Sequence, residues 1–295
     1  MDEESPSHPR SRAVEGRPGA MHALLVMGGV GDFLHYLTRL PDFLREKRLA
    51  PSDLRVFVES LVPDQAEAVF TKAFPQLSFT FLCPAIHWAN TFPLLTPSRR
   101  IERINRPAYR YVESLGFRQI TDWFLPFLCD NYDFDISPLL RVVAGIPKQD
   151  HPYMVISARD KGFLWWPSRQ VCREAHQLVT RTHKAVYVGA PNETISGIDE
   201  LETLPNVPEA LALSYHADLF IGTDTGLATM RELAGKRNIY CVSRFWLEEV
   251  MIRYGYFDSR VRSQTKSAFA FSRPDLLNLL TPEFSGKSTS HMRTR

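Results

Sequence analysis

A glycine-rich turn that ends in an aspartate is the first part of the sequence able to do chemistry. The stretch LLVMGGVGDFLHYL, residues 24 to 37, leads from an apolar segment of strand length through Gly29 and Gly31 to Asp32. Small residues let another molecule approach the backbone, and a carboxylate beside such a space can act as a general base. An aspartate at the start of a helix also commonly caps that helix. The spacing alone therefore leaves a catalytic role and a capping role open.

The same turn could instead hold a dinucleotide. The fingerprint for that ligand needs a third glycine, where the helix packs closely against the strand. Gly29 and Gly31 supply the first two glycines, but Leu34 occupies the third position. Glu59, at the end of the next predicted strand, lies farther along the chain than the usual ~20 residues for a ribose-binding acid. An NAD-dependent oxidoreductase is therefore kept only as an alternative.

A second helix start has the features of an anion site. In FIGTDTGLATMRELAG, residues 220 to 235, a predicted strand ends and a predicted helix begins near Thr225. The N–H groups of Thr225, Gly226 and Leu227 then point outward at the positive end of the helix dipole, which suits a phosphate or diphosphate. Asp224 is itself an anion, so it is better suited to cap the helix or to bind a hydroxyl or amide. A capped helix without a ligand is the alternative.

Alternating strand and helix patterns must position these two turns. Apolar runs of strand length occur at 22–27, 54–60, 77–83, 153–159, 184–190, 218–224 and 238–244. Helical spacing of apolar residues lies between them, at 32–49, 64–74, 168–182, 208–217, 226–235 and from 272 onward. This alternation predicts an α/β protein built of parallel sheets, with ligands at the carboxyl ends of the strands.

Two halves with this pattern predict two Rossmann-like domains. Proline, glycine and charge accumulate at 144–152, so we place the boundary there. The expected organisation is a disordered leader at 1–20, an N-terminal Rossmann-like domain at 21–148, a C-terminal Rossmann-like domain at 149–284 and a flexible tail at 285–295.

The composition limits the classes of function. The chain of 295 residues has a net charge of +2, which does not by itself indicate a partner of opposite charge. Its four cysteines and nine histidines form no metal-ligand spacing, so we expect no metal site. No apolar run reaches the ~20 residues that a membrane span needs, and the N-terminus has no signal-peptide core. These features favour a cytoplasmic protein without a transmembrane segment.

Four short segments resemble the heptosyltransferase family of glycosyltransferases. They are MGGVGDFLHYLTRLP, ISARDKGFLWWP, VGAPNET and GTDTGLATM, and they occur in the family's order. The resemblance implies a GT-B fold, in which two Rossmann-like domains with parallel sheets face each other across a central cleft. It also implies transfer of a sugar from a nucleotide-diphosphate donor to an acceptor hydroxyl. The N-terminal domain would then be the acceptor-side domain and the C-terminal domain the nucleotide-sugar-binding domain. The donor is then a co-substrate, and neither a metal nor a bound cofactor is needed.

The resemblance also implies roles for individual residues. Asp32 would be the general base that takes the proton of the acceptor hydroxyl. Lys161, or Arg159 if a short insertion displaces the lysine, would neutralise charge on the departing diphosphate. Glu193 would bind the donor ribose, and the helix start at 224–226 would cradle the diphosphate.

The sequence departs from the family at two positions. Leu164 stands where the family has a lysine close before Trp-Pro, and Thr229 stands where a histidine commonly follows Asp-Thr-Gly. A non-catalytic protein that binds a nucleotide sugar or a glycan is therefore a further alternative.

A run of arginines and aromatic residues at 98–118 is the candidate acceptor site. We single out Arg103, Arg106 and Tyr109, because arginine pairs with phosphate and aromatic rings stack on sugars or bases. The expected acceptor is an anionic glycan, a glycolipid or a nucleic acid, and a lipid acceptor would bring the protein to the inner membrane surface. A solvated helix with ordinary ion pairs explains the same run.

Overall fold

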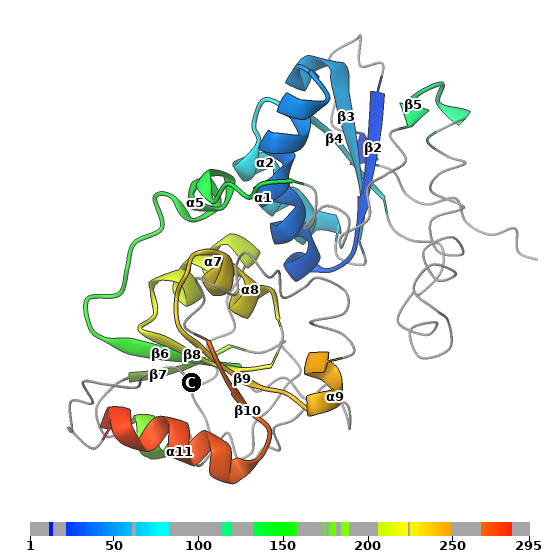
Figure 1. The fold of residues 1–295 in the computed structure, drawn as a ribbon. Coiled ribbons are helices and arrows are strands. Elements are labelled where there is room, and N and C mark those ends of the chain that lie inside the picture. The colour runs from blue at the N-terminus through cyan, green and yellow to red at the C-terminus, as the bar shows by residue number, and fades with distance from the viewer. Residues whose placement is uncertain are drawn as a thin grey trace, which may run out of the picture. The chain divides into compact units, whose positions relative to one another are not determined.

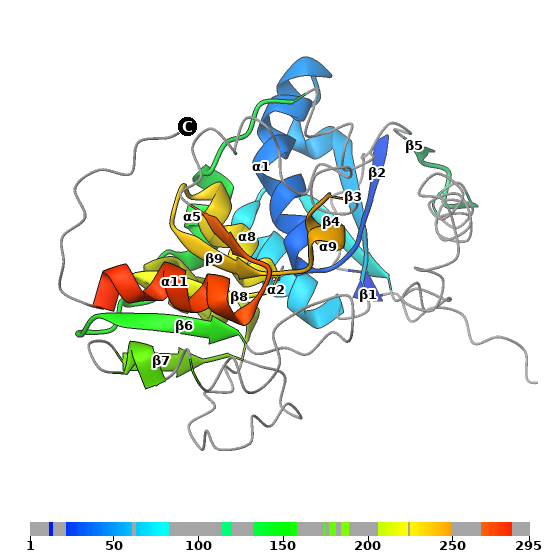
Figure 2. The same ribbon diagram turned by 60° about the horizontal axis from the view of Figure 1, so that its bottom comes forward.

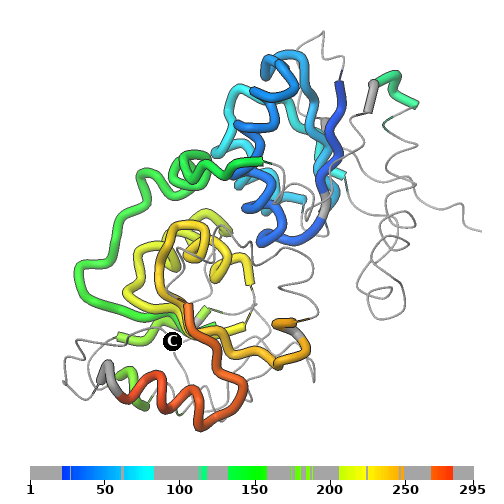
Figure 3. The backbone as a smooth tube through the Cα atoms, viewed as in Figure 1, coloured from blue at the N-terminus to red at the C-terminus, as the bar shows by residue number. Residues whose placement is uncertain are grey.

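The computed structural model describes residues 12–13, 22–60, 63–82, 112, 114–119, 132–157, 174, 177–180, 184–188, 206–223, 225–248 and 267–284. The chain forms two compact units, Met1–Val142 and Val143–Arg295, and their described segments are coloured in Figure 3. The division falls inside helix α5 (Ser137–Val143), a few residues before the boundary predicted from the sequence. The cleft between the domains remains a prediction.

The first unit contains a sheet with the strand order β1-β4-β3-β2-β5. Its strands are β1 (Arg12–Ala13), β2 (His22–Met27), β3 (Leu54–Glu59), β4 (Ser78–Leu82) and β5 (Arg118–Gln119). Strands β2 to β5 pair in parallel, while β1 pairs antiparallel with β4. The strand order reverses direction at β2, because β3 lies on one side of it and β5 on the other. In open parallel sheets, ligands bind at the carboxyl ends of strands at such a reversal.

Two helices cover one face of this sheet (Figure 1). They are α1 (Val30–Glu46) and α2 (Pro63–Ala73), and a short 3-10 helix, η1 (Pro51–Asp53), precedes β3. The ring of Phe33 packs edge-on against Phe70 at 5.1 Å between centroids, and Phe70 lies 5.5 Å from Phe79 of β4. This aromatic chain joins α1, α2 and the sheet into one core, because each ring is buried.

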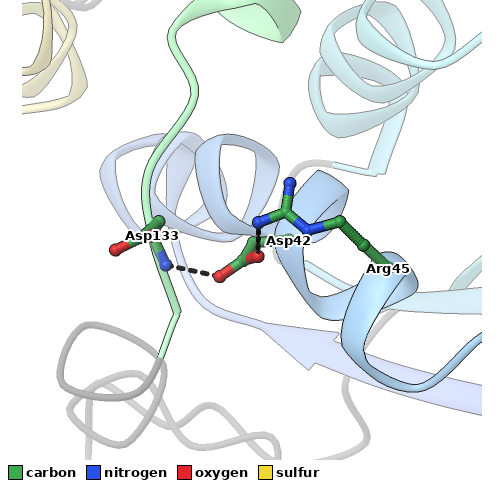
Figure 4. A network of polar contacts seen from close by, with 3 residues as sticks. All are labelled: Asp42, Arg45 and Asp133. Atoms are coloured by element: carbon green, nitrogen blue, oxygen red, sulfur yellow. Dashed lines mark hydrogen bonds and ion pairs between the residues drawn. The ribbon is translucent and has the colours of Figure 1, made fainter.

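A polar contact fastens the chain after residue 131 to α1 (Figure 4). The backbone N–H of Asp133 donates to the Asp42 carboxylate at 2.7 Å, and the same carboxylate pairs with Arg45 one turn along the helix. The N–H of Asp135 donates to the carbonyl oxygen of Thr38 at 2.7 Å. The segment that leads to α5 therefore runs along α1.

The second unit contains a parallel sheet with the strand order β10-β9-β8-β6-β7. Its strands are β6 (Tyr153–Ser157), β7 (Lys184–Tyr187), β8 (Leu219–Gly222), β9 (Asn238–Cys241) and β10 (Ala268–Ala270). Its helices are α7 (Val207–His216), α8 (Gly226–Leu233), α9 (Arg244–Trp246) and α11 (Arg273–Phe284). The strand order reverses between β6 and β8, and the helix that follows β8 is α8.

Helices cover both faces of the second sheet (Figures 1 and 2). The Tyr153 hydroxyl of β6 donates to the carbonyl oxygen of Leu213 in α7 at 2.7 Å, which places α7 on one face. Leu276 and Leu280 of α11 belong to the hydrophobic cluster on the other face, with Ile156 and Ile221. The predicted α/β class with two parallel sheets is confirmed.

The structure differs from the sequence prediction at several places. Arg12–Ala13 form β1, although the leader was expected to be disordered, and this strand is antiparallel. Strands β5 and β10 and helix α5 were not predicted. Helix α1 begins at Val30, two residues before the predicted start, because Gly29 rather than a later residue is its N-cap.

Candidate functional site

The turn between β2 and α1 depends on Gly28. This residue has a φ of +136°, which residues with a side chain rarely adopt, and its N–H donates to the carbonyl oxygen of Glu59 at 3.3 Å. A Cβ atom on Gly28 would lie only 2.3 Å from Oδ2 of Asp32. Glycine is therefore required at position 28, because any side chain there would clash with the Asp32 carboxylate. Sequence reasoning assigned the turn to Gly29 and Gly31 and missed Gly28, although it belongs to the same run of glycines.

Asp32 is the third residue of α1 and caps it. Its Oδ2 atom accepts a hydrogen bond from the N–H of Gly29 at 2.7 Å, and Gly29 is the N-cap residue. One expectation is corrected here. Gly31 lies in the first turn of the helix rather than in a loop, because α1 begins at Val30. The Asp32 carboxylate occupies the space beside Gly28.

Replacing Gly28 by alanine is expected to destabilise the first unit by about 2 to 4 kcal/mol, through backbone strain and the clash with Asp32. Gly29→Ala is the matched control, because a Cβ there would lie 3.7 Å from the same oxygen, an ordinary contact. Urea unfolding of both variants checks this. Equal stability of the two variants would contradict the close packing of Asp32 on Gly28.

The second candidate site is the start of α8. Thr225 is the N-cap, with extended backbone angles, and its side chain accepts a hydrogen bond from the N–H of Ala228 at 3.4 Å. The cap is therefore Thr225, and not Asp224 as the sequence suggested. The N–H groups of Gly226 and Leu227 have no partner within the helix, because the first turn has no preceding carbonyl oxygens to accept from them.

Thr229 stands where the family pattern has a histidine, and its side chain binds within the helix. The residue is 7% exposed, and its hydroxyl donates to the carbonyl oxygen of Thr225 at 3.1 Å. Its N–H donates to the same oxygen at 3.0 Å. Thr229 therefore reinforces the first turn of α8.

Thr223 adds a buried hydroxyl at the end of β8. The residue is 1% exposed, and its Oγ1 atom has no hydrogen-bond partner among the residues that the structure describes. A buried polar group in this state is costly unless a ligand or water satisfies it. Sequence reasoning named only the residues from 224 onward. The position of a hydroxyl directly after a buried strand is the signal that could have identified Thr223.

Gly222 brings two strands together at the same edge. A Cβ on Gly222 would lie 2.8 Å from the carbonyl oxygen of Ser157, so only glycine permits this approach of β8 to β6. Ser157 and Gly222 are the paired last residues of these strands. The start of α8 thus lies next to the point where the strand order reverses, which is the expected ligand position in such a sheet.

A buried arginine holds α8 in place. Arg231 is 1% exposed and donates to the carbonyl oxygens of Ser214 and Ala217, each at 2.6 Å, and to the side-chain oxygen of Asn238 at 3.0 Å. Burial lowers its pKa to about 10, so the guanidinium stays charged at neutral pH. These bonds connect α8 to the end of α7 and to the start of β9.

The remaining predicted site residues lie outside the described part of the chain. They are Lys161, Arg159, Glu193, Asp224, Arg103, Arg106 and Tyr109. Within the described ranges, no group of three or more histidine, cysteine, aspartate or glutamate side chains could hold a metal ion. The helices described there include none with both the length and the apolar character needed to cross a membrane.

No protein-family model and no curated protein matches the sequence. Among solved structures, the fold is similar to a glycosyl transferase family 9 protein from Veillonella parvula, with 10% identity, 88% of each chain covered and a TM-score of 0.44. For the ADP-heptose lps heptosyltransferase II of E. coli, the identity is 12%, the coverage is 89% of this chain and 99% of that one, and the TM-score is 0.49.

A third match is a putative UDP-N-acetylglucosamine 2-epimerase from Listeria monocytogenes. It has 9% identity, covers 92% of this chain and 98% of its own, and has a TM-score of 0.48. At these identities the likeness concerns the fold, and it assigns neither an activity nor a site residue to this chain.

Proposed function

We propose that the protein is a glycosyltransferase that moves a sugar from a nucleotide-diphosphate donor to an acceptor hydroxyl without a metal ion. The observation that carries the proposal is the start of α8, beside which the buried hydroxyl of Thr223 has no partner among the described residues. Helix N-termini favour anions, and this one lies where the strand order of the second sheet reverses. The four sequence segments that resemble heptosyltransferases support the same conclusion.

In the proposed reaction, the second unit holds the donor. The N–H groups of Gly226 and Leu227 bind the diphosphate, whose negative charge grows as the bond to the sugar breaks. The Thr223 hydroxyl donates to the same group or to a water beside it. From the family resemblance, Lys161 or Arg159 would add positive charge, Glu193 would bind the ribose, and Asp224 would bind a hydroxyl or amide of the donor.

Asp32 is the proposed general base. It would take the proton of the acceptor hydroxyl while the hydroxyl oxygen bonds to the anomeric carbon, and the diphosphate would leave with the electron pair of the broken C–O bond. The hydrogen bond from Gly29 orients the carboxylate. The acceptor would be an anionic glycan or a glycolipid bound near Arg103, Arg106 and Tyr109.

A protein that binds a nucleotide sugar without turning it over is the second candidate. Thr229 favours it, because this residue stands where the family pattern has a histidine and its hydroxyl donates within the helix. Both candidates require the anion site at the start of α8, so binding of the donor is tested first.

A nucleoside diphosphate is expected to raise the melting temperature by several degrees, because saturation at about 100 times Kd adds about 2.7 kcal/mol of stability. The samples are the protein with ADP, UDP, GDP or NAD⁺. No shift with any nucleoside diphosphate would contradict the donor site. A shift with NAD⁺ alone would favour the oxidoreductase alternative.

Gly226→Pro is expected to weaken diphosphate binding by about ten-fold or more, through loss of one N–H donor. Proline is well tolerated at the first position of a helix, and the extended angles of Thr225 suit the residue before a proline. Gly226→Ala is the matched control, because it keeps the N–H group. Isothermal titration with ADP compares the two, and equal affinities would place the nucleotide elsewhere.

A further inference from the structure

Glu59 is a buried carboxyl group that no described residue satisfies. It is the last residue of β3 and is only 6% exposed. Its Oε2 atom has no hydrogen-bond partner in the described part of the chain. Burial raises its pKa to about 7. The cost of burying this group is therefore not offset by a partner within the described protein.

The neighbours of Glu59 on the sheet are apolar. Alternation along β3 places Glu59 on the same face as Phe57, which belongs to a buried cluster with Leu25 and Leu82. Arg55 is the charged residue of β3 on that face, and its guanidinium lies over the ring of Phe117 at 5.6 Å from the centroid. Four residues of strand separate Arg55 from Glu59, about 13 Å, so it is not an ion-pair partner at close range.

Backbone contacts link Glu59 to the turn between β2 and α1, which leads to Asp32. It pairs with Met27 at the end of β2, and its carbonyl oxygen accepts the N–H of Gly28 at 3.3 Å. Gly28 in turn packs against the Asp32 carboxylate. The two carboxyl groups thus belong to one edge of the sheet, at the carboxyl ends of neighbouring strands. In the dinucleotide-binding Rossmann fold, an acid about 20 residues after the glycine-rich turn binds the ribose 2′-hydroxyl of the ligand.

We propose that Glu59 is a sugar-binding residue that makes hydrogen bonds to ring hydroxyls of the acceptor at this edge of the N-terminal sheet. This inference rests on the proposed function, since it assigns the acceptor to the unit that holds Asp32. A carboxyl group can accept hydrogen bonds from hydroxyls when ionised and donate one when protonated, and hydroxyls do both. The ribose of a dinucleotide offers the same chemistry and is the other possible source of the hydroxyls.

Binding measured by saturation-transfer NMR distinguishes these sources. The probes are the methyl glycosides of glucose, galactose and mannose for the acceptor, and NAD⁺ for the ribose, each at millimolar concentration. We expect at least one methyl glycoside to bind the wild-type chain, and Glu59→Gln to weaken it about ten-fold. Glu46→Gln, on the exposed end of α1, is the matched control and should bind like the wild type.

Three results would overturn the proposal. They are the absence of methyl glycoside binding to the wild-type chain, equal binding by Glu59→Gln and the wild type, and binding of NAD⁺ alone. Glu59→Leu, which removes both oxygens, repeats the test if the glutamine variant does not fold. ADP binding is measured on the same samples. Loss of the proposed function would appear as no ADP binding to any variant, whereas failure of this inference leaves ADP binding intact.

Discussion

Asp32→Asn is expected to lower the rate of sugar transfer by about two to four orders of magnitude while the chain stays folded. The asparagine oxygen can still accept the hydrogen bond from Gly29, so the start of α1 keeps its cap. An amide does not take a proton at neutral pH, so the base is lost. The release of nucleoside diphosphate measures turnover, and the melting temperature with and without ADP measures folding and donor binding.

Asp53→Asn is a control with the same local geometry. Asp53 is the third residue of η1, and its carboxylate accepts the N–H of Ala50 at 3.1 Å, as Asp32 does from Gly29. It lies before β3 rather than at the carboxyl end of a strand, so its replacement should leave turnover unchanged. Full turnover by Asp32→Asn would remove the base assignment. Donor binding without turnover by the wild-type chain would favour the non-catalytic binding protein.

Glu59→Gln is expected to raise the free energy of unfolding by about 3 kcal/mol above pH 7. The folded pKa of about 7 lies above the usual value of 4.5, and each unit of difference corresponds to ~1.4 kcal/mol. Below pH 4.5 the carboxyl is protonated in both states, so the two proteins should be equally stable there. Between these values the unfolded chain loses the proton first, and the stability of the wild type falls as the pH rises.

Urea unfolding at about pH 5 and about pH 8 measures this difference. The glutamine variant should lose less stability than the wild type between the two conditions, and Glu46→Gln should follow the wild type because Glu46 is exposed. Identical pH profiles for Glu59→Gln and the wild type would mean that the carboxyl is solvated. If Glu59→Gln is more stable than the wild type but binds sugar more weakly, the Glu59 carboxyl group serves ligand binding at a cost in stability.

Most of the strands and helices in the described part of the chain could be predicted from the sequence. The apolar runs HALLVM and LRVFVE became β2 and β3, and NIYC lies at the start of the predicted strand that became β9. Ser272 accepts the N–H of Asp275 at 3.4 Å at the start of α11, as its place before a proline predicted. These elements depend on local periodicity and local capping, so the residues within each window suffice to predict them.

The sites were predicted only in part. Asp32 and the N–H groups of Gly226 and Leu227 were named from the sequence, because each lies where a predicted strand leads into a predicted helix. The predicted N-cap of α8 was wrong. Aspartate and threonine are both good caps, and only the backbone angles select Thr225 over Asp224.

Local residue types thus determine which segments of this chain form strands and helices, and which polar residues follow them. Burial and pairing between distant segments were decided only in the tertiary structure. Glu59 is an ordinary glutamate in the sequence, and it becomes a buried acid because β2 and β4 pair on both sides of it. Its Oε2 atom has no hydrogen-bond partner in the described part of the chain. Gly28 is required because the Asp32 carboxylate packs against it. Arg231 is buried because carbonyl oxygens from the end of α7 and from the start of β9 accept its hydrogen bonds.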